Sequence, residues 1–157
     1  MKKTIITSLT TIVMFTQISC GGGEGKVAIL NESKAPFAAP EFHLYQTSDY
    51  LEAFKIGIAE KRNDIKNIIE NSEAPTFANT IDALELSGKT LGKVSSIFFN
   101  LNESNNSPEM VEVENAVTPM LTELSGYIYM NDSLFARIRT LYDKKETLGL
   151  NEEQSIV

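Results

Sequence analysis

Apolar side chains recur at helical intervals along most of the chain from residue 48 onward. A first helix is expected from residue 49 to about residue 71, because its apolar positions step by three, four, seven and four residues. These positions are Leu51, Phe54, Ile58, Ile65 and Ile69. Such spacing is typical of an amphipathic α-helix with one face toward a core. Asp49 and Glu52 are three residues apart and predict a capping box at its start.

A second helix is expected over about residues 76–101, with Thr76 as its N-cap. Its apolar face consists of Phe77, Ile81, Leu84, Leu91, Val94, Phe98 and Leu101. Gly88 and Gly92 lie in the middle of this stretch. Each glycine costs about 1 kcal/mol relative to alanine inside a helix. The pair therefore indicates either a break or a close contact with another helix.

A third and a fourth helix follow the polar turn NESNNSP. Ser107 and Pro108 predict the N-cap and first position of the third helix, and Pro119 predicts a bend within it. Its apolar stripe is Met110, Val113, Val117, Met120, Leu124 and Ile128. Asn131 or Asp132 is expected to cap the fourth helix. The residues expected to face inward from the fourth helix are Leu134, Phe135, Ile138, Leu141 and Tyr142.

The last residues predict the beginning of one more helix. Gly149 fits the end of the fourth helix, and Asn151 and Gln154 have the spacing of a capping box. A helix much shorter than about 12 residues has little stability of its own. No stretch alternates long enough to predict a strand. We therefore expect an all-α fold of antiparallel amphipathic helices, in which residues 48–157 form an incomplete domain cut at the start of a further helix.

Residues 1–19 are expected to be a signal peptide of the lipoprotein type. Lys2 and Lys3 precede an apolar stretch at residues 4–16, which is too short to span a bilayer. Ser19 directly before Cys20 is typical of a bacterial lipoprotein cleavage site, after which Cys20 would carry the lipid. Gln17 departs from the apolar residue usual at its position. An ordinary cleaved signal and an uncleaved anchor are the alternatives.

Residues 20–47 are interpreted as the lipidated cysteine, a flexible tether and an extended arm. The stretch GGGEGK lacks the first glycine and the final Ser or Thr of a phosphate-binding loop, so it is read as a linker. Residues 27–47 contain two prolines and several aromatic residues without a helical period. Such a segment is expected to pack along the helical body.

The charge balance argues against nucleic-acid binding. The 157-residue chain has a formal net charge of −7 at pH 7, whereas phosphate binding needs clustered basic residues. Cleavage before Cys20 would remove Lys2 and Lys3 and no acidic residue, which leaves 14 − 2 = 12 basic residues against 21 acidic ones, a net −9. Attachment to a membrane would then depend on the lipid and not on surface charge.

The chain is poor in groups that could carry out catalysis. His43 is the only histidine, and lipidation would remove the only thiol, so we read His43 as an ordinary arm residue. Two groups of acidic residues are interpreted as solvated helix surface, with a metal site as the less favoured alternative. They are Glu109, Glu112 and Glu114, and Glu60 with Asp64. Tyr127, Tyr129 and Tyr142 are read as core positions, with a groove as the alternative.

Residues 48–104 strongly resemble the start of bacterial peptidyl-dipeptidases (dipeptidyl carboxypeptidases), which belong to the thimet oligopeptidase family of zinc metallopeptidases. The stretches that carry this resemblance are YLEAF, APTFANTIDALELSG and KVSSIFFNLN. AVTPMLTE and NDSLFARIRTLYDKKETLGLNEEQ continue it downstream, and APFAAPEF resembles the family's N-terminal arm. The likeness covers roughly residues 36–157, in the same order.

The resemblance implies a large helical shell around a channel that admits short peptides. It also implies zinc held by a His-Glu-x-x-His motif and a downstream glutamate, none of which occurs in this sequence. No catalytic, cofactor-binding or metal-binding residue can therefore be carried over to this chain. The implied function is that of an N-terminal fragment of a peptidase that releases C-terminal dipeptides from oligopeptides, with a role in shaping the channel.

A short lipoprotein that acts as a non-catalytic peptide-binding or interaction module is the alternative, followed by a purely structural envelope protein. In both main readings the expected location is the bacterial cell envelope, with a lipid anchor. Periplasmic and outer-membrane placements both stay open. The partners expected are oligopeptide substrates and a membrane.

Overall fold

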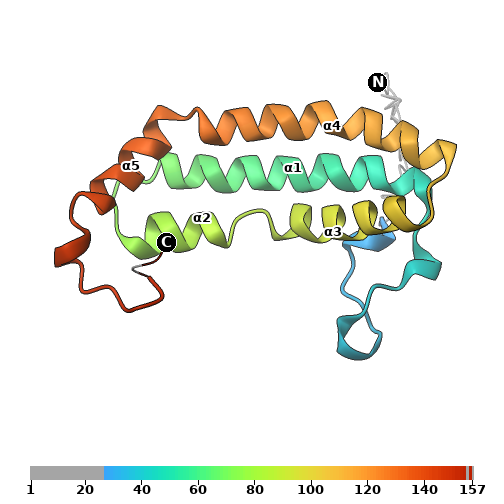
Figure 1. The fold of residues 1–157 in the computed structure, drawn as a ribbon, viewed down its shortest axis with the longest axis horizontal. Helices are drawn as coiled ribbons and strands as arrows, with labels where there is room; N and C mark the ends of the chain where they lie inside the picture. Colours follow the sequence, from blue (N-terminus) through green and yellow to red (C-terminus); the bar gives the residue numbers. More distant parts are fainter. Residues whose placement is uncertain (1–26, 155, 157) are drawn as a thin grey trace, which may run out of the picture.

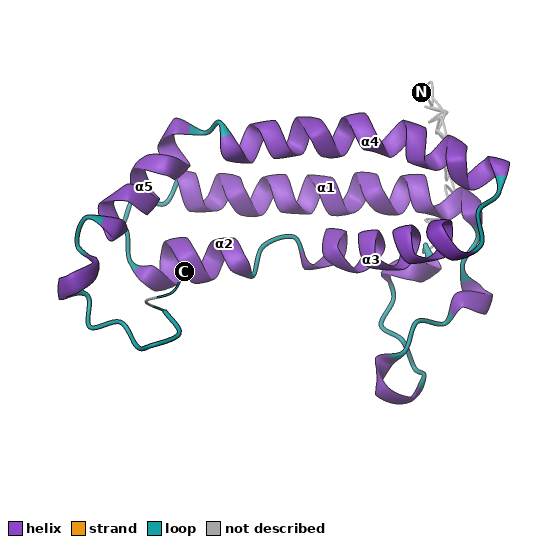
Figure 2. Ribbon diagram, viewed as in Figure 1, coloured by secondary structure: helices purple, strands orange, loops and turns teal. Residues whose placement is uncertain are grey.

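Every regular element of the described residues is a helix (Figure 2). The structure is a computed structural model that describes residues 27–154 and 156. The expected all-α class is confirmed over these residues, where helices pack together without strands. The segment read as a signal peptide, Cys20 and the tether lie outside the described residues. None of the helices described is long and apolar enough to cross a lipid bilayer.

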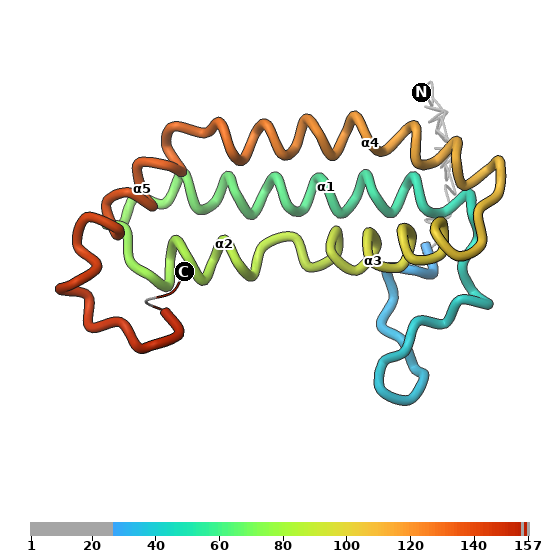
Figure 3. Tube along the Cα trace, in the orientation of Figure 1, coloured from blue at the N-terminus to red at the C-terminus, as the bar shows by residue number. Residues whose placement is uncertain are grey.

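The long helix α1 (Thr47–Ile69) lies in the middle of the molecule (Figure 1). Helix α4 (Pro108–Tyr129) runs along one side of it. The shorter helices α2 (Ala83–Glu85) and α3 (Lys89–Ser104) run along the other side. The trace in Figure 3 shows that α1 and α4 run in one direction and α2 and α3 in the opposite one. Helix α5 (Asp132–Tyr142) packs across the end of α1.

The main core forms where α1, α3 and α4 meet. An aromatic cluster occupies its centre, with the rings of Phe54 and Phe98 edge to face at a centroid distance of 5.3 Å. Tyr50 and Phe99 also contact Phe98, at 5.1 and 5.2 Å. Such edge-to-face pairs contribute about 0.5–1.5 kcal/mol beyond the burial of their area. A smaller cluster of Ile65, Ile68 and Leu134 joins the far end of α1 to α5.

The first helix begins earlier than the sequence indicates, and its predicted capping box is wrong. Helix α1 starts at Thr47 with Gln46 as N-cap, and no side chain caps it. Asp49 therefore lies in the first turn, where its negative charge is favourable beside the helix dipole. The caps of the later helices are confirmed. Thr76, Ser107 and Asn131 each accept a hydrogen bond from the backbone N–H three residues on.

The single helix expected over residues 76–101 is interrupted. A turn of π-helix, η4 (Phe77–Asp82), leads into α2, and the chain then breaks before α3 begins at Lys89. The break falls at Gly88, which is buried and has a φ of +71°. A side chain on Gly88 would meet Lys61, because a Cβ atom there would lie 2.4 Å from the Lys61 Cδ. The glycine pair was expected to indicate either a break or a close helix contact, and at Gly88 it is a break.

Gly92 marks neither a break nor a contact, since a Cβ atom on it would meet no atom within 4 Å. The close helix contact is instead at Gly57 of α1. A Cβ atom on Gly57 would lie 2.9 Å from the Cα of Leu91 in α3. The absence of a side chain at Gly57 thus sets how near α1 and α3 approach each other.

The N-terminal arm packs against the body as expected, but it is not extended. Three 3-10 turns, η1 (Ala28–Leu30), η2 (Pro36–Ala38) and η3 (Phe42–Leu44), shape it. Ile29 of η1 is buried in the main core. At η2 the chain turns through left-handed backbone at Phe37 and Ala38, and the Phe37 side chain is fully exposed.

The residues expected to face inward from the fourth helix are confirmed only in part. Leu134 and Leu141 face inward and are buried. Phe135 and Tyr142 were expected to face inward as well, and this is wrong, because they are 61% and 66% exposed. After α5 the chain makes the turn η5 (Lys145–Thr147), so Gly149 lies beyond this turn and not directly after the helix. Asn151 and Gln154 form the predicted capping box, each side chain accepting from the other's backbone N–H.

The two glycines provide a matched test of the helix break. Changing Gly88 to alanine is expected to lower the free energy of unfolding by about 1–2 kcal/mol from the left-handed backbone alone, with a further loss from the clash with Lys61. Changing Gly92 to alanine is expected to raise it by up to about 1 kcal/mol, since the helix there is open to solvent. Urea unfolding followed by far-ultraviolet circular dichroism measures both. Equal effects of the two changes would contradict this account.

Candidate functional site

Polar side chains gather at the break between α2 and α3. The Lys61 Nζ atom donates hydrogen bonds to the Ser87 carbonyl at 3.1 Å and to the Ser87 Oγ at 2.5 Å. The Gly88 N–H donates to the Asp64 Oδ2 at 2.9 Å. Burial lowers the pKa of Lys61, while the nearby charges of Asp64 and Glu85 act in the opposite direction. Two side chains of α1 therefore satisfy backbone groups that the break leaves without helical partners.

A cleft of about 380 Å³ lies beside this junction, between α1 and the η4–α2 segment. Its wall combines polar and apolar side chains. The lining residues are Asp64, Asn67, Ile68, Asn71, Asn79, Ala83, Leu86 and Ser87. Amide and carboxylate side chains of this kind can donate to and accept from a peptide backbone. Several of these polar groups already bond within the molecule, since Asp64 accepts from Gly88 and Asn79 accepts from Thr76 and Arg137, and the lining presents no cluster of catalytic groups.

Arg137 closes the other end of this region and was not singled out from the sequence. It is 9% exposed, and its Nη1 donates to the carbonyls of Asn71 and Glu73 at 2.9 and 3.3 Å. Its Nη2 donates to the Asn79 Oδ1 at 3.1 Å. The same Asn79 oxygen accepts from the N–H of Thr76 at 2.8 Å. One guanidinium therefore ties α5 to the end of α1 and to the start of η4.

The only signal for Arg137 in the sequence is its place on α5. It lies three residues after Leu134 and four before Leu141, on the side that both leucines turn inward. A basic residue on an apolar face is typical of a buried hydrogen-bonding role, but the partners come from residues about 60 positions earlier. The hydrogen-bond partners of Arg137 could therefore not be found from local spacing.

A second hollow, of about 560 Å³, lies between the arm and α3. Tyr45 of the arm and Lys93, Ser96 and Ile97 of α3 are among its lining residues. The Lys93 Nζ also donates to the carbonyl of Asn31 at 2.6 Å, which fastens the arm to α3. Residues of the arm therefore form one side of this hollow, and residues of α3 form the other.

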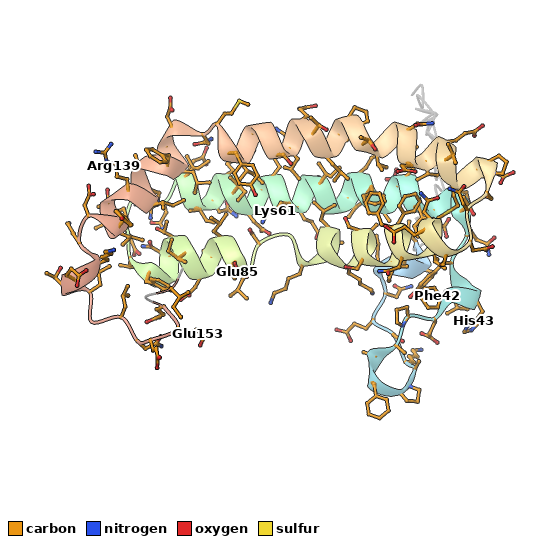
Figure 4. The ribbon with its side chains drawn as sticks, in the orientation of Figure 1. Phe42, His43, Lys61, Glu85, Arg139 and Glu153 are labelled. Carbon is orange, nitrogen blue, oxygen red and sulfur yellow. The ribbon has the colours of Figure 1, made fainter. Side chains whose placement is uncertain are left out.

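The structure separates the side chains that the sequence offered for chemistry. His43 is exposed on the arm, far from Lys61 and Glu85 (Figure 4). Glu109 is exposed at the start of α4, where hydrogen bonds from its own backbone N–H and from Ser107 lower its pKa. Glu114 accepts from the Asn102 amide at 2.8 Å. Within residues 27–154 no three His, Cys, Asp or Glu side chains gather as a metal site requires.

The three tyrosines singled out from the sequence have different surroundings. Tyr127 faces α1, with the Arg62 guanidinium 4.7 Å from its ring centre. Tyr129 is 87% exposed at the end of α4. Tyr142 is exposed on α5, with the Lys145 ammonium 4.7 Å from its ring centre. The core interpretation is therefore wrong for Tyr129 and Tyr142, and the three rings have different neighbours.

Comparison with known proteins shows which proteins these helices are similar to. No protein-family model matches the chain. A dipeptidyl carboxypeptidase of Salmonella typhimurium is 36% identical over 125 residues, and one of Escherichia coli is 37% identical over 124 residues. These matches cover 80% and 79% of this chain and 18% of each relative. Oligopeptidase A of Escherichia coli is 25% identical over 124 residues.

The chain is therefore homologous to a part of the bacterial peptidases. The chain is 36–37% identical to the dipeptidyl carboxypeptidases and 25% identical to oligopeptidase A. This similarity confirms the resemblance found in the sequence. The chain spans about a fifth of the length of these relatives.

Arg137 and Arg139 provide a matched pair for testing the junction, since both are on α5. Changing Arg137 to methionine is expected to lower the free energy of unfolding by about 1–3 kcal/mol, because partly buried oxygen acceptors of Asn71, Glu73 and Asn79 lose their donor. Changing Arg139 to methionine should alter it by less than about 0.5 kcal/mol, since its contact with Asp143 is exposed and 3.8 Å long. Urea unfolding measures both, and a similar small effect of each change would contradict the role of Arg137.

Proposed function

We propose that this chain is the N-terminal part of a zinc peptidase that releases C-terminal dipeptides from oligopeptides. The observation that carries the proposal is its 36–37% identity with dipeptidyl carboxypeptidases over four-fifths of its length. Because the match covers 18% of those relatives, the activity belongs to a longer polypeptide of which these helices form one part. The substrates of that polypeptide are oligopeptides with a free C-terminus.

The described helices are proposed to form part of the wall of the substrate channel and to support it. They are not proposed to take part in cleavage of the peptide bond. The cleft beside α1 is lined by polar and apolar side chains, and the arm adds a second hollow along α3. Rigid helices fastened by Arg137 and Lys61 can limit which chains reach a reaction centre. Folded proteins would be excluded and short peptides admitted.

The described residues do not fit the zinc that such a peptidase uses. Metal ligands in proteins are chiefly His, Cys, Asp and Glu side chains that converge within a few ångströms. Across residues 27–154 no such group of three exists. The ligands and the water-activating carboxylate are therefore proposed to lie in another part of the longer polypeptide.

Residues 1–19 are proposed to direct export and Cys20 to carry the lipid anchor. The support is the sequence itself, in which a charged start and a short apolar stretch lead to Ser19 and Cys20. The peptidase would then work in the cell envelope on peptides, held at a membrane by its lipid. The net negative charge of the helical part gives no attraction of its own to anionic lipid.

The peptidase proposal is tested on the full-length polypeptide encoded by the source genome. We expect it to release dipeptides from the C-termini of oligopeptides and to lose this activity on removal of zinc by a chelator. Residues 20–157 alone should release none, because they lack a converging set of metal ligands. Liquid chromatography and mass spectrometry of the products measure both. Dipeptide release by residues 20–157, or none by the full-length polypeptide, would overturn the proposal.

Lipidation is tested by metabolic labelling with palmitate. The protein with its own sequence should incorporate label and fractionate with membranes, and Cys20→Ala should do neither. Gln17→Leu is the matched control, since it supplies the apolar residue usual at that position and should keep the label. Label that persists in Cys20→Ala would show that another residue or another process attaches the protein.

A further inference from the structure

Residues 77–87 carry little buried apolar surface, and we call them the flap. They comprise η4, α2 and the turn that follows α2. Of the residues that the structure describes here, Thr80 alone is buried, while Phe77, Ile81 and Leu84 are half-buried. Helices α1, α3, α4 and α5 each bury large apolar side chains. Because burial of apolar surface provides most of the stabilisation of a fold, the flap is attached less firmly than these four helices.

Polar contacts fasten the flap near both of its ends. Near the C-terminal end, the Lys61 ammonium of α1 donates to the carbonyl and the hydroxyl of Ser87. Near the N-terminal end, the Arg137 guanidinium of α5 donates to the Asn79 side chain, and its two carbonyl acceptors lie outside the flap. Donors and acceptors that separate regain hydrogen bonds to water, so such contacts contribute only a modest net free energy. Water can therefore replace these contacts when the flap moves away from α1.

The chain can bend on either side of the flap. Gly88 has a φ of +71° and no side chain, so its backbone can change conformation with little steric resistance. The Gly88 N–H is bound by Asp64 at 2.9 Å, which keeps this pivot attached to α1 while the flap moves. On the other side, residues 71–76 join α1 to η4 without helical structure. Hinges in proteins are typically a few such residues at the ends of regular elements.

The flap forms one side of the cleft beside α1, and Figure 1 shows α2 lying along α1 ahead of the break. The lining residues that belong to the flap are Asn79, Ala83, Leu86 and Ser87. Those on the opposite side, from α1 and the residues just after it, are Asp64, Asn67, Ile68 and Asn71. A movement of the flap away from α1 therefore separates the two sides of the cleft.

We propose that the flap opens and closes as a unit, bending at Gly88 and at residues 71–76, while α1, α3 and α4 stay folded. Lys61 is the residue of α1 that holds it closed, through its two hydrogen bonds to Ser87. Opening turns the cleft of about 380 Å³ into a wider groove and exposes Ile68, which is buried in the closed form. The flap is thus a lid on the cleft, and it does not require the peptidase activity proposed above.

The lid is tested by native-state hydrogen exchange of the full-length polypeptide, followed by mass spectrometry. After correction for intrinsic rates, the backbone N–H groups of the flap are expected to exchange at least about tenfold faster than those of α3. Urea should accelerate exchange in the flap less than exchange in α3, because opening exposes less surface than unfolding does.

Two variants of α1 test the role of Lys61. Lys61→Met removes the ammonium and keeps an apolar stem, and it should speed exchange in the flap by about 10- to 100-fold, since opening no longer breaks hydrogen bonds to a charged group. Lys66→Met is the matched control, because Lys66 forms only an exposed 3.8 Å ion pair with Glu70. It should change exchange in the flap by no more than about twofold.

Faster exchange in the flap with a weak dependence on urea, and acceleration by Lys61→Met but not by Lys66→Met, support the lid. Exchange in the flap at the rate and urea dependence of α3 overturns it, because the two then open only together. Equal effects of the two variants also overturn it, since Lys61 then does not hold the flap closed. The rates in the unaltered protein decide whether the flap opens separately, even if Lys61→Met fails to fold.

Discussion

The structure depends on the burial of α1 between its neighbours. This helix contacts α2, α3, α4 and α5, and the arm reaches it through η1. Two features make the arrangement possible. Gly57 lets the backbone of α3 approach at Leu91, and the aromatic rings around Phe98 fill the wider space nearby. Because one helix supplies a face to so many partners, a change in its register would disturb both clusters of buried residues at once.

Much of the helical body could be predicted from sequence, because it depends on local spacing. The apolar stripes of α3 and α4 place Val94, Phe98 and Val117 in the core, as the pattern indicates. The caps at Thr76, Ser107 and Asn131 were found for the same reason, since a cap and its partner are three residues apart. The start of α1 was missed because Gln46 caps it without a side-chain bond, which leaves no signal to read.

The remaining differences come from contacts between distant parts of the chain. Local spacing offers Phe135 and Tyr142 as inward residues, yet α5 turns a different side to α1 because Leu134, Leu141 and Arg137 fit there. The three acceptors of Arg137 lie near residues 71–79, and no local pattern connects them to α5. The polar junction at Lys61 and Asp64 has the same origin, since both residues act on the break at Gly88 more than 20 positions away.

The arm is fixed to the body by Ile29, which is buried among the aromatic rings of the main core. The Lys93 ammonium holds the carbonyl of Asn31 only two residues later. Any tension applied to the chain ahead of Val27 is therefore borne first by these two neighbouring contacts. An apolar side chain drawn from a packed core resists such tension over a short distance and then yields abruptly. The mechanical strength of the protein toward its N-terminal side is thus set at Ile29, before any of the long helices carries load.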